Sequence, residues 1–312
     1  MQKNGRWCRR VGVWSLVLIC SLFAARASAG PPQYMPLIPV SDFDLLVYGS
    51  FRTGVLNDNG NVQVADGASR LGFAVGHDLG NGLGAIAVYE FGVWSSAGSI
   101  VTPDLWGTTH PQRHTYVGLK GDWGAITLGS QWAPLAGAIG NYMDKSNYFG
   151  GQGFVKGQYR IPYSVVFERC WNQNCTKALF MDAQMSSGED DLDRTTVAGN
   201  WQLNKLTIGA AYQDHGNDDF RGVSFQMPLE LLGQSATLAG GYVSTQTTGN
   251  GWDINLQLGN LWLDYGVNAS NSAKIIVDYL YPLTKNFALI GEVYVENDVS
   301  KDAGVVLVKY DF

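Results

Sequence analysis

Hydrophobic and polar side chains alternate along most of this chain with a period close to two. In the last segment, for example, Val306, Val308 and Tyr310 alternate with Lys309 and Asp311. A period of two places successive side chains on opposite faces of an extended strand, so the pattern predicts strands rather than helices. Sixteen such segments can be read, at 45–54, 69–78, 83–94, 113–122, 125–131, 159–169, 176–186, 194–203, 205–213, 221–227, 235–245, 251–259, 261–269, 273–282, 287–297 and 303–312.

Short and long connections separate these segments. The connections after the second, fourth, eighth and twelfth segments are tight, whereas those after the first, third and fifth are long and cover 55–68, 95–112 and 132–158. Short turns at one end, long loops at the other and both termini at the short-turn end are typical of outer-membrane barrels. We therefore expect an all-β protein, a transmembrane antiparallel β-barrel of sixteen strands, within roughly 14 to 18.

A secreted β-sandwich would show the same alternation, and the polar face of each strand separates the two folds. In 159–169 the odd positions 161 to 167 form an apolar face, while Arg160, Ser164 and Glu168 lie on the other. Unpaired charges in a dry sandwich core would be very costly. The pattern therefore favours a water-filled lumen, enclosed by a ring that leaves no strand edge exposed to lipid.

Composition excludes the main alternatives. No apolar stretch after the N-terminal segment approaches the roughly 20 residues that a membrane-spanning helix needs. Charged residues make up only 15% of the chain, aromatic residues reach 12% and glycine occurs 39 times. Soluble globular proteins usually contain about 25% charged residues, so this composition also argues against a soluble enzyme.

The N-terminus has the pattern of a secretory signal peptide. Four basic residues up to Arg10 precede an apolar run at 11–25 and a small-residue site at Ala27-Ser28-Ala29. We expect cleavage after Ala29, leaving residues 30–312 as one barrel domain. The segment holds five of the 21 Lys and Arg residues and none of the 27 Asp and Glu residues, so the mature net charge is −11. An acidic chain with no basic block is a poor candidate for nucleic-acid binding.

Several short motifs, in order, resemble the general trimeric porins of Gram-negative bacteria. They are SRLGF at 69–73, DLGNGL at 78–83, YEFG at 89–92, YVGLKGDWG at 116–124, LGSQ at 128–131 and the terminal aromatic Phe312. The resemblance implies an outer-membrane homotrimer of sixteen-stranded barrels, surrounded by lipid and lipopolysaccharide. It also implies that the third loop, 132–158, folds into each lumen and narrows the pore.

Candidate pore-constriction residues follow from the same resemblance. Arg70 and Arg113 match the family's wall arginines, Arg160 matches the arginine that starts the strand after the loop, and Arg52 and Lys156 are further candidates. The family's loop commonly carries two or more acids facing this cluster, but here it holds one, Asp144, followed by Lys145. Because rings of charged side chains set ion preference, we expect less cation selectivity than the net charge suggests.

The remaining reactive side chains indicate no catalytic or metal centre. Cys170 and Cys175, the two cysteines left after cleavage, are close enough in sequence for a disulfide in an oxidising compartment. A metal site is the alternative, but two thiolates are too few for zinc. Acidic clusters at 189–193 and 214–219 are either solvated loops or loose divalent-cation sites. No cofactor is implied.

These observations predict a porin for passive diffusion of small hydrophilic solutes and ions, with no enzymatic activity. A substrate-selective channel is the alternative within the same class. An outer-membrane barrel enzyme would need a nucleophile and a base held together, and no such pair can be recognised in the sequence. An adhesin with a blocked lumen is the third possibility.

Overall fold

The computed structural model describes residues 44–98, 112–150, 159–185, 192–216, 218–297 and 302–312. The predicted signal peptide, its cleavage site and the candidate Lys156 lie outside these residues, as do the acidic residues at 189–191. Within the described part of the chain, no helix is both long enough and apolar enough to span a membrane.

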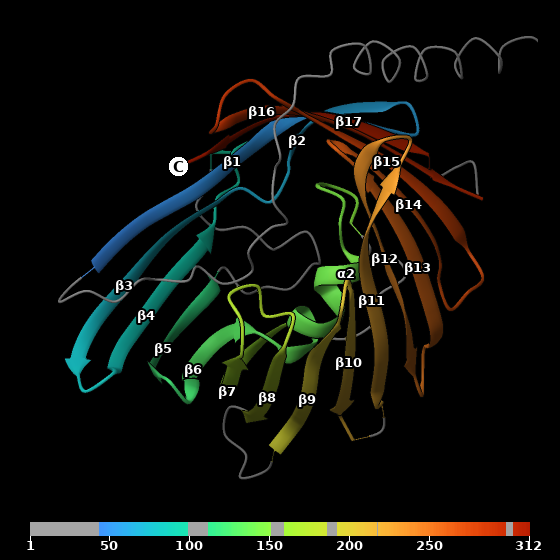
Figure 1. Cartoon of the computed structure of the whole chain (residues 1–312). Coiled ribbons are helices and arrows are strands. Elements are labelled where there is room, and N and C mark those ends of the chain that lie inside the picture. The colour runs from blue at the N-terminus through green and yellow to red at the C-terminus, as the bar shows by residue number, and fades with distance from the viewer. Residues whose placement is uncertain (1–43, 99–111, 151–158, 186–191, 217, 298–301) are drawn as a thin grey trace, which may run out of the picture.

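The described residues form one sheet of antiparallel strands that closes on itself (Figure 1). Strands that follow one another in the chain pair, with one exception near the N-terminus given below, and the last strand pairs with the first, Phe51 lying opposite Tyr310. The strands are β1 (Asp44–Asp58), β2 (Asn61–Asp66), β3 (Arg70–Gly80), β4 (Leu83–Gly92), β5 (Gln112–Gly121), β6 (Gly124–Trp132), β7 (Arg160–Cys170), β8 (Ala178–Met185), β9 (Leu192–Leu203), β10 (Leu206–Asp214), β11 (Phe220–Leu231), β12 (Gln234–Thr245), β13 (Gly249–Leu258), β14 (Leu261–Val267), β15 (Ala273–Pro282), β16 (Phe287–Glu296) and β17 (Ala303–Asp311).

Seventeen strands occupy sixteen positions in the barrel, because β2 and β3 share one. Both pair with the same edge of β1: Thr53 lies opposite Asp66 in β2, and Ser50 lies opposite Arg70 in β3. The sixteen-stranded closed barrel that the alternation predicted is therefore confirmed. The first connection was expected to be a loop over 55–68, but most of it extends the wall as the hairpin of β1 and β2. This hairpin turns at Asn59-Gly60, where both residues have positive φ, as a tight hairpin turn requires.

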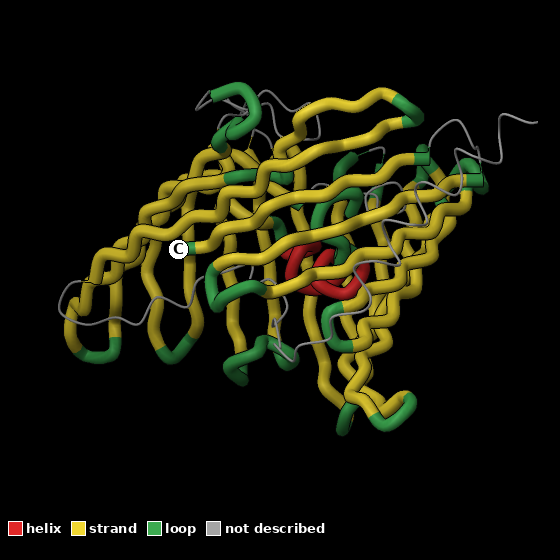
Figure 2. Tube along the Cα trace, turned by 90° about the horizontal axis from the view of Figure 1, so that it is seen from above, coloured by secondary structure: helices red, strands yellow, loops and turns green. Residues whose placement is uncertain are grey.

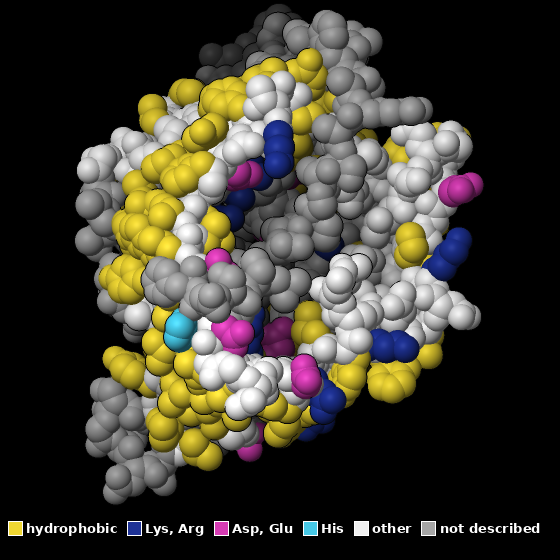
Figure 3. Space-filling view, turned by 60° about the vertical axis from the view of Figure 1, so that its left-hand side comes forward, with side chains coloured by type: hydrophobic (Ala, Val, Ile, Leu, Met, Phe, Trp, Pro, Cys, Tyr) yellow, Lys and Arg dark blue, Asp and Glu magenta, His cyan; other side chains and the backbone are white. Residues whose placement is uncertain are grey.

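Apolar side chains face outward and polar ones inward along most strands, as the alternation predicted. Val306, Val308 and Tyr310 of β17 are each more than 40% exposed on the outside, while Glu292 of β16 faces inward and is 1% exposed. In the space-filling view, hydrophobic side chains cover the outer wall and charged side chains line the hollow (Figure 3).

One predicted alternation is wrong at the start of β7. Ile161 was placed on the same face as Tyr163, but Ile161 is fully buried inside the barrel and Tyr163 is 58% exposed. The pairing of β6 with β7 shifts by one residue between Gly129 and Gln131, and Tyr163 has a positive φ of 52°. A β-bulge adds one residue to a strand and reverses the alternation beyond it.

The described part of the connection between β6 and β7 lies inside the barrel, as predicted for the third loop (Figure 2). We call this part, residues 133–150, L3. It contains a π-helix, η1 (Ala136–Gly140), followed by one helical turn, α2 (Asn141–Met143), which lie within the ring of strands (Figure 2). Leu135, Ala138, Ile139 and Met143 pack with apolar side chains of β7 to β12. An apolar cluster therefore lies inside this half of the barrel beside buried polar side chains, which the expectation of a wet lumen did not include.

Candidate functional site

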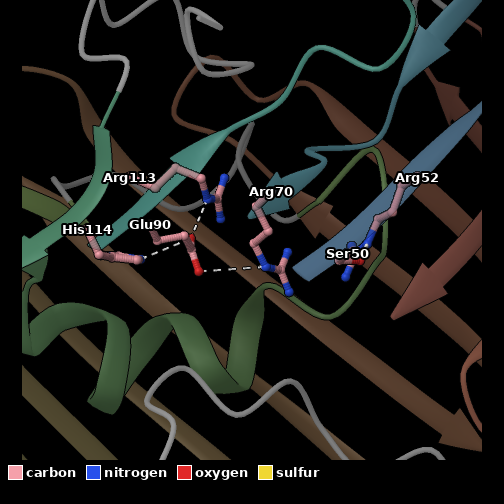
Figure 4. Close-up of polar contacts among 6 residues, drawn as sticks. All are labelled: Ser50, Arg52, Arg70, Glu90, Arg113 and His114. Atoms are coloured by element: carbon pink, nitrogen blue, oxygen red, sulfur yellow. Dashed lines mark hydrogen bonds and ion pairs between the residues drawn. The ribbon is translucent and has the colours of Figure 1, made fainter. Parts of the chain in front are cut away.

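Three of the predicted arginines gather on the inner wall of neighbouring strands. Arg52 on β1, Arg70 on β3 and Arg113 on β5 lie side by side (Figure 4), and Lys309 on β17 is the direct cross-strand partner of Arg52. We call these four residues the basic arc. Because alternate residues of adjacent strands share a face, the register of β17, β1, β3 and β5 brings the four side chains to one side of the lumen.

Glu90 on β4 lies between two members of the basic arc. Its Oε1 accepts a hydrogen bond of 2.6 Å from Arg113 Nε, and its Oε2 lies 3.9 Å from Arg70 Nε. His114 Nε2 is 3.8 Å from the same carboxylate. Glu90 therefore orients the guanidinium groups of the arc and partly compensates their charge. It lies in the YEFG motif at 89–92, but sequence reasoning did not include it among the site residues, nor did it include Lys309.

The basic arc carries more positive than negative charge. Lys309 Nζ forms an ion pair of 2.8 Å with Asp311, while the Arg52 side chain donates from Nε to Ser50 Oγ at 3.0 Å. The arc thus sets four cations against two carboxylates, Glu90 and Asp311. The two cations in excess give this side of the lumen a positive electrostatic potential.

Arg160 lies next to this group rather than within it. Its guanidinium stacks over the ring of Trp132, 4.7 Å from the centroid, and the same ring contacts His114 at 4.8 Å. Cation–π contact of this kind holds a guanidinium in place without neutralising it. Arg160 therefore extends the positive wall toward β7.

Asp144, the predicted acidic partner of the arginines, is directed elsewhere. It lies close enough to interact electrostatically with Asp253, Asp264 and Lys274, on β13 to β15, and with the adjacent Lys145. The adjacent Lys145 donates to Gln226 Oε1 at 3.3 Å. Burial lowers the pKa of Lys145 to about 8, so it stays largely protonated at neutral pH and offsets Asp144.

L3 follows a single row of paired residues across the inner wall. The row, which we call the L3 seat, consists of directly paired residues on successive strands from β8 to β15: Ala178, Asn200, Gly209, Ser224, Gly241, Asp253, Gly266 and Lys274. Three of its members donate hydrogen bonds to L3 carbonyl groups: Asn200 to Gly137 at 3.1 Å, Ser224 to Ala138 at 2.6 Å and Lys274 to Gly150 at 2.7 Å.

Glycines in the seat permit this close approach. A Cβ atom at Gly209 would lie 2.0 Å from the carbonyl oxygen of Ala138, and one at Gly241 would lie 2.6 Å from Met143 Sδ. Both distances are far inside van der Waals contact. The backbone of L3 therefore rests directly on the wall where the wall has no side chain.

Carboxylates of β15 and β16 hold the far end of the described part of L3. Glu292 accepts hydrogen bonds from the backbone N–H groups of Asn147, Tyr148 and Phe149 at 2.7 to 3.0 Å, and its cross-strand partner Asp278 accepts from Asn147. Bonds from N–H groups to a carboxylate are among the stronger hydrogen bonds in proteins. L3 is thus tied to both sides of the barrel and crosses its interior.

Comparison with known proteins agrees with this geometry. Residues 15–164 match the family described as Gram-negative porin. The chain is 35% identical over 111 residues to the major outer membrane protein P.IB of Neisseria gonorrhoeae, and 30% identical over 133 residues to that of Neisseria meningitidis. These matches cover 31% and 38% of this chain, and 30% and 38% of the two relatives. Over these segments the chain is similar to the Gram-negative porins.

Solved porin structures share the fold over most of the chain. The anion-selective porin from Comamonas acidovorans superimposes with a TM-score of 0.64 at 17% identity, covering 86% of this chain and 100% of that one. Salmonella typhi OmpF, solved in complex with daunomycin, gives 0.62 at 12% identity, covering 86% and 97%. The barrel described here lies in the outer membrane of a Gram-negative bacterium. The matched segment spans about a third of the length of its Neisseria relatives.

The structure brings Arg52, Arg70 and Arg113 together (Figure 4), places Arg160 beside them and places Asp144 near β13 to β15. It also contains the predicted disulfide between Cys170 and Cys175, with a Cα–Cα distance of 4.8 Å. Together with Glu168, these cysteines form the one group of possible metal ligands among the described residues. Because both sulfur atoms are already bonded to each other, this group offers no thiolate to a metal.

Proposed function

We propose that this porin forms a water-filled channel for the passive diffusion of small hydrophilic solutes, with a preference for anions. The observation that carries the proposal is the basic arc, which presents four cations and two carboxylates on one side of a closed barrel. L3 adds almost no opposing charge, because Lys145 accompanies Asp144. Fixed charges that line a constriction favour ions of the opposite sign.

The proposed pore-constriction residues are Arg52, Arg70 and Arg113, with Arg160 at the edge and Lys309 and Glu90 added from the structure. Lys156 remains a candidate from the sequence resemblance. We further propose a homotrimer in contact with outer-membrane lipid and lipopolysaccharide, without enzymatic activity. The family resemblance supports this assembly, and migration on a denaturing gel before and after boiling tests it.

Recordings of single channels in a planar lipid bilayer test the channel itself. We expect steady current steps in potassium chloride that grow in proportion to salt concentration, as for a water-filled pore. Block of the current by one class of solute would instead show a substrate-selective channel. If purified protein whose gel mobility changes on boiling produced no current, the proposal would be contradicted. That result would favour an adhesin with a blocked lumen.

A further inference from the structure

The disulfide-closed turn between β7 and β8 lies directly beside L3. Cys170 ends β7 and pairs in register with Ala178, the first residue of the L3 seat. Both cysteines pack against the apolar cluster that contains Leu135, Ala138 and Ile139 of L3. The turn therefore supports the beginning of L3 from the same end of the barrel as the short β5–β6 turn.

Asn200 joins the turn to L3 through a single amide group. Its Nδ2 atom donates to the carbonyl oxygen of Cys175 at 2.9 Å and to that of Gly137 in η1 at 3.1 Å. An amide nitrogen has two hydrogen atoms, so it serves both carbonyl groups at once. Asn200 is only 4% exposed, and loss of either partner would leave a buried donor unsatisfied.

The Cys175 carbonyl keeps its direction because the turn is constrained. Cys175 has a φ of 48°, a left-handed conformation that residues other than glycine rarely adopt. Its N–H donates to the carbonyl oxygen of Asn172 at 3.1 Å, and its side chain is covalently bonded to Cys170. Without the covalent bond, this unfavourable conformation would have fewer restraints, and the carbonyl could turn away from Asn200.

We propose that the Cys170–Cys175 disulfide positions L3 in the lumen through Asn200, so that the current through the channel depends on this disulfide. The inference rests on the proposed channel function. Asn200 is a positioning residue in this scheme: it faces the backbone of L3 and acts on the pore through the place that it gives to Gly137 and Ala138.

Reduction of the disulfide gives a direct experimental handle. Dithiothreitol supplies two electrons and two protons, the S–S bond becomes two thiols, and the reagent is oxidised to its cyclic disulfide. Both cysteines are half-buried rather than enclosed. Single channels that are already inserted in a bilayer can therefore be recorded before and after the reagent is added.

Three variants complete the test: the double variant Cys170→Ser with Cys175→Ser, Asn200→Ala, and Gln173→Ala as a matched control. Gln173 lies exposed in the same turn. We expect dithiothreitol to raise the open-channel noise of the wild type about twofold, as for a loop that begins to sample a second position. Asn200→Ala and the double cysteine variant should show this noise without the reagent. The double variant should not respond to it, and Gln173→Ala should behave like the wild type.

Unchanged current in the reduced wild type and in Asn200→Ala would overturn the inference while leaving the channel function intact. Absence of any current in the oxidised wild type would instead overturn the proposed function. If the double cysteine variant fails to fold, the reduced wild-type channels still decide between these outcomes, because they were folded and inserted before reduction.

Discussion

Glu90 shows how one residue changes the net charge of the basic arc. Its carboxylate contacts Arg70, Arg113 and His114, which lie on two other strands of the wall. The sequence contains Glu90 within a family-like motif, but its partners lie 20 to 24 positions away and become neighbours only through strand register. Sequence reasoning therefore recognised the arginines by their motif positions and missed the carboxylate between them.

Replacing Glu90 with glutamine should strengthen the preference for anions. The amide keeps a similar shape but removes one negative charge from the arc. Two unit charges about 4 Å apart in a water-like medium interact by about 1 kcal/mol, so the chloride-to-potassium permeability ratio should rise about two- to fivefold.

The permeability ratio follows from the zero-current potential across a potassium chloride gradient. Glu230→Gln is the matched control, because Glu230 is exposed near the end of β11 and should leave the ratio unchanged. A ratio in Glu90→Gln equal to that of the wild type would mean that Glu90 does not face the permeating ions.

At the scale of elements, the position of L3 depends on the wall as much as on L3 itself. The seat combines hydrogen-bond donors at Asn200, Ser224 and Lys274 with glycines that admit the backbone. The contacting residues are between 63 and 124 positions apart in the chain. The family resemblance implied a third loop in the lumen, whereas the path of this loop depends on the register of eight strands.

Adding one methyl group to the seat should displace L3. In Gly209→Ala the new Cβ would lie 2.0 Å from the carbonyl oxygen of Ala138, so the backbone of L3 must move. Overpacking of this kind typically costs about 1 to 3 kcal/mol. We expect a changed single-channel conductance and a lower unfolding temperature, with the barrel itself retained.

Gly291→Ala provides the matched control for this displacement. Gly291 also lies within a strand, but a Cβ atom there would meet nothing within 4 Å. Its conductance and unfolding temperature should match those of the wild type. Equal conductance in Gly209→Ala would show that L3 does not rest on this part of the wall.

At the scale of the whole molecule, alternation along the chain was sufficient to predict the ring. Each of the sixteen predicted segments corresponds to one strand position in the barrel wall. The prediction works because inward-facing and outward-facing side chains alternate along every strand. Two local features departed from the alternation: the β1–β2 hairpin, which was taken for a loop, and the bulge at Tyr163. The hairpin depends on the positive φ angles of its turn residues, and the bulge depends on a one-residue shift in strand pairing. The hydrophobic pattern carries no information about either.

The distribution of charge across the barrel also differs from the sequence-based expectation. The single acid of L3 was expected opposite the arginines, but Asp144 interacts with β13 to β15, and the wall carboxylates Asp278 and Glu292 bind the L3 backbone instead. The negative net charge of the chain therefore says little about the constriction. We propose that the basic arc, rather than the net charge, determines the ion preference.

The most direct test of this account is the zero-current potential of the wild type and of the double variant Arg70→Gln with Arg113→Gln across a potassium chloride gradient. We expect the zero-current potential of the wild type to have the sign that indicates a preference for chloride. In the double variant this potential should shift clearly toward the value for a potassium-preferring channel. A wild-type channel that prefers potassium, with a potential that the double substitution leaves unchanged, would contradict the account.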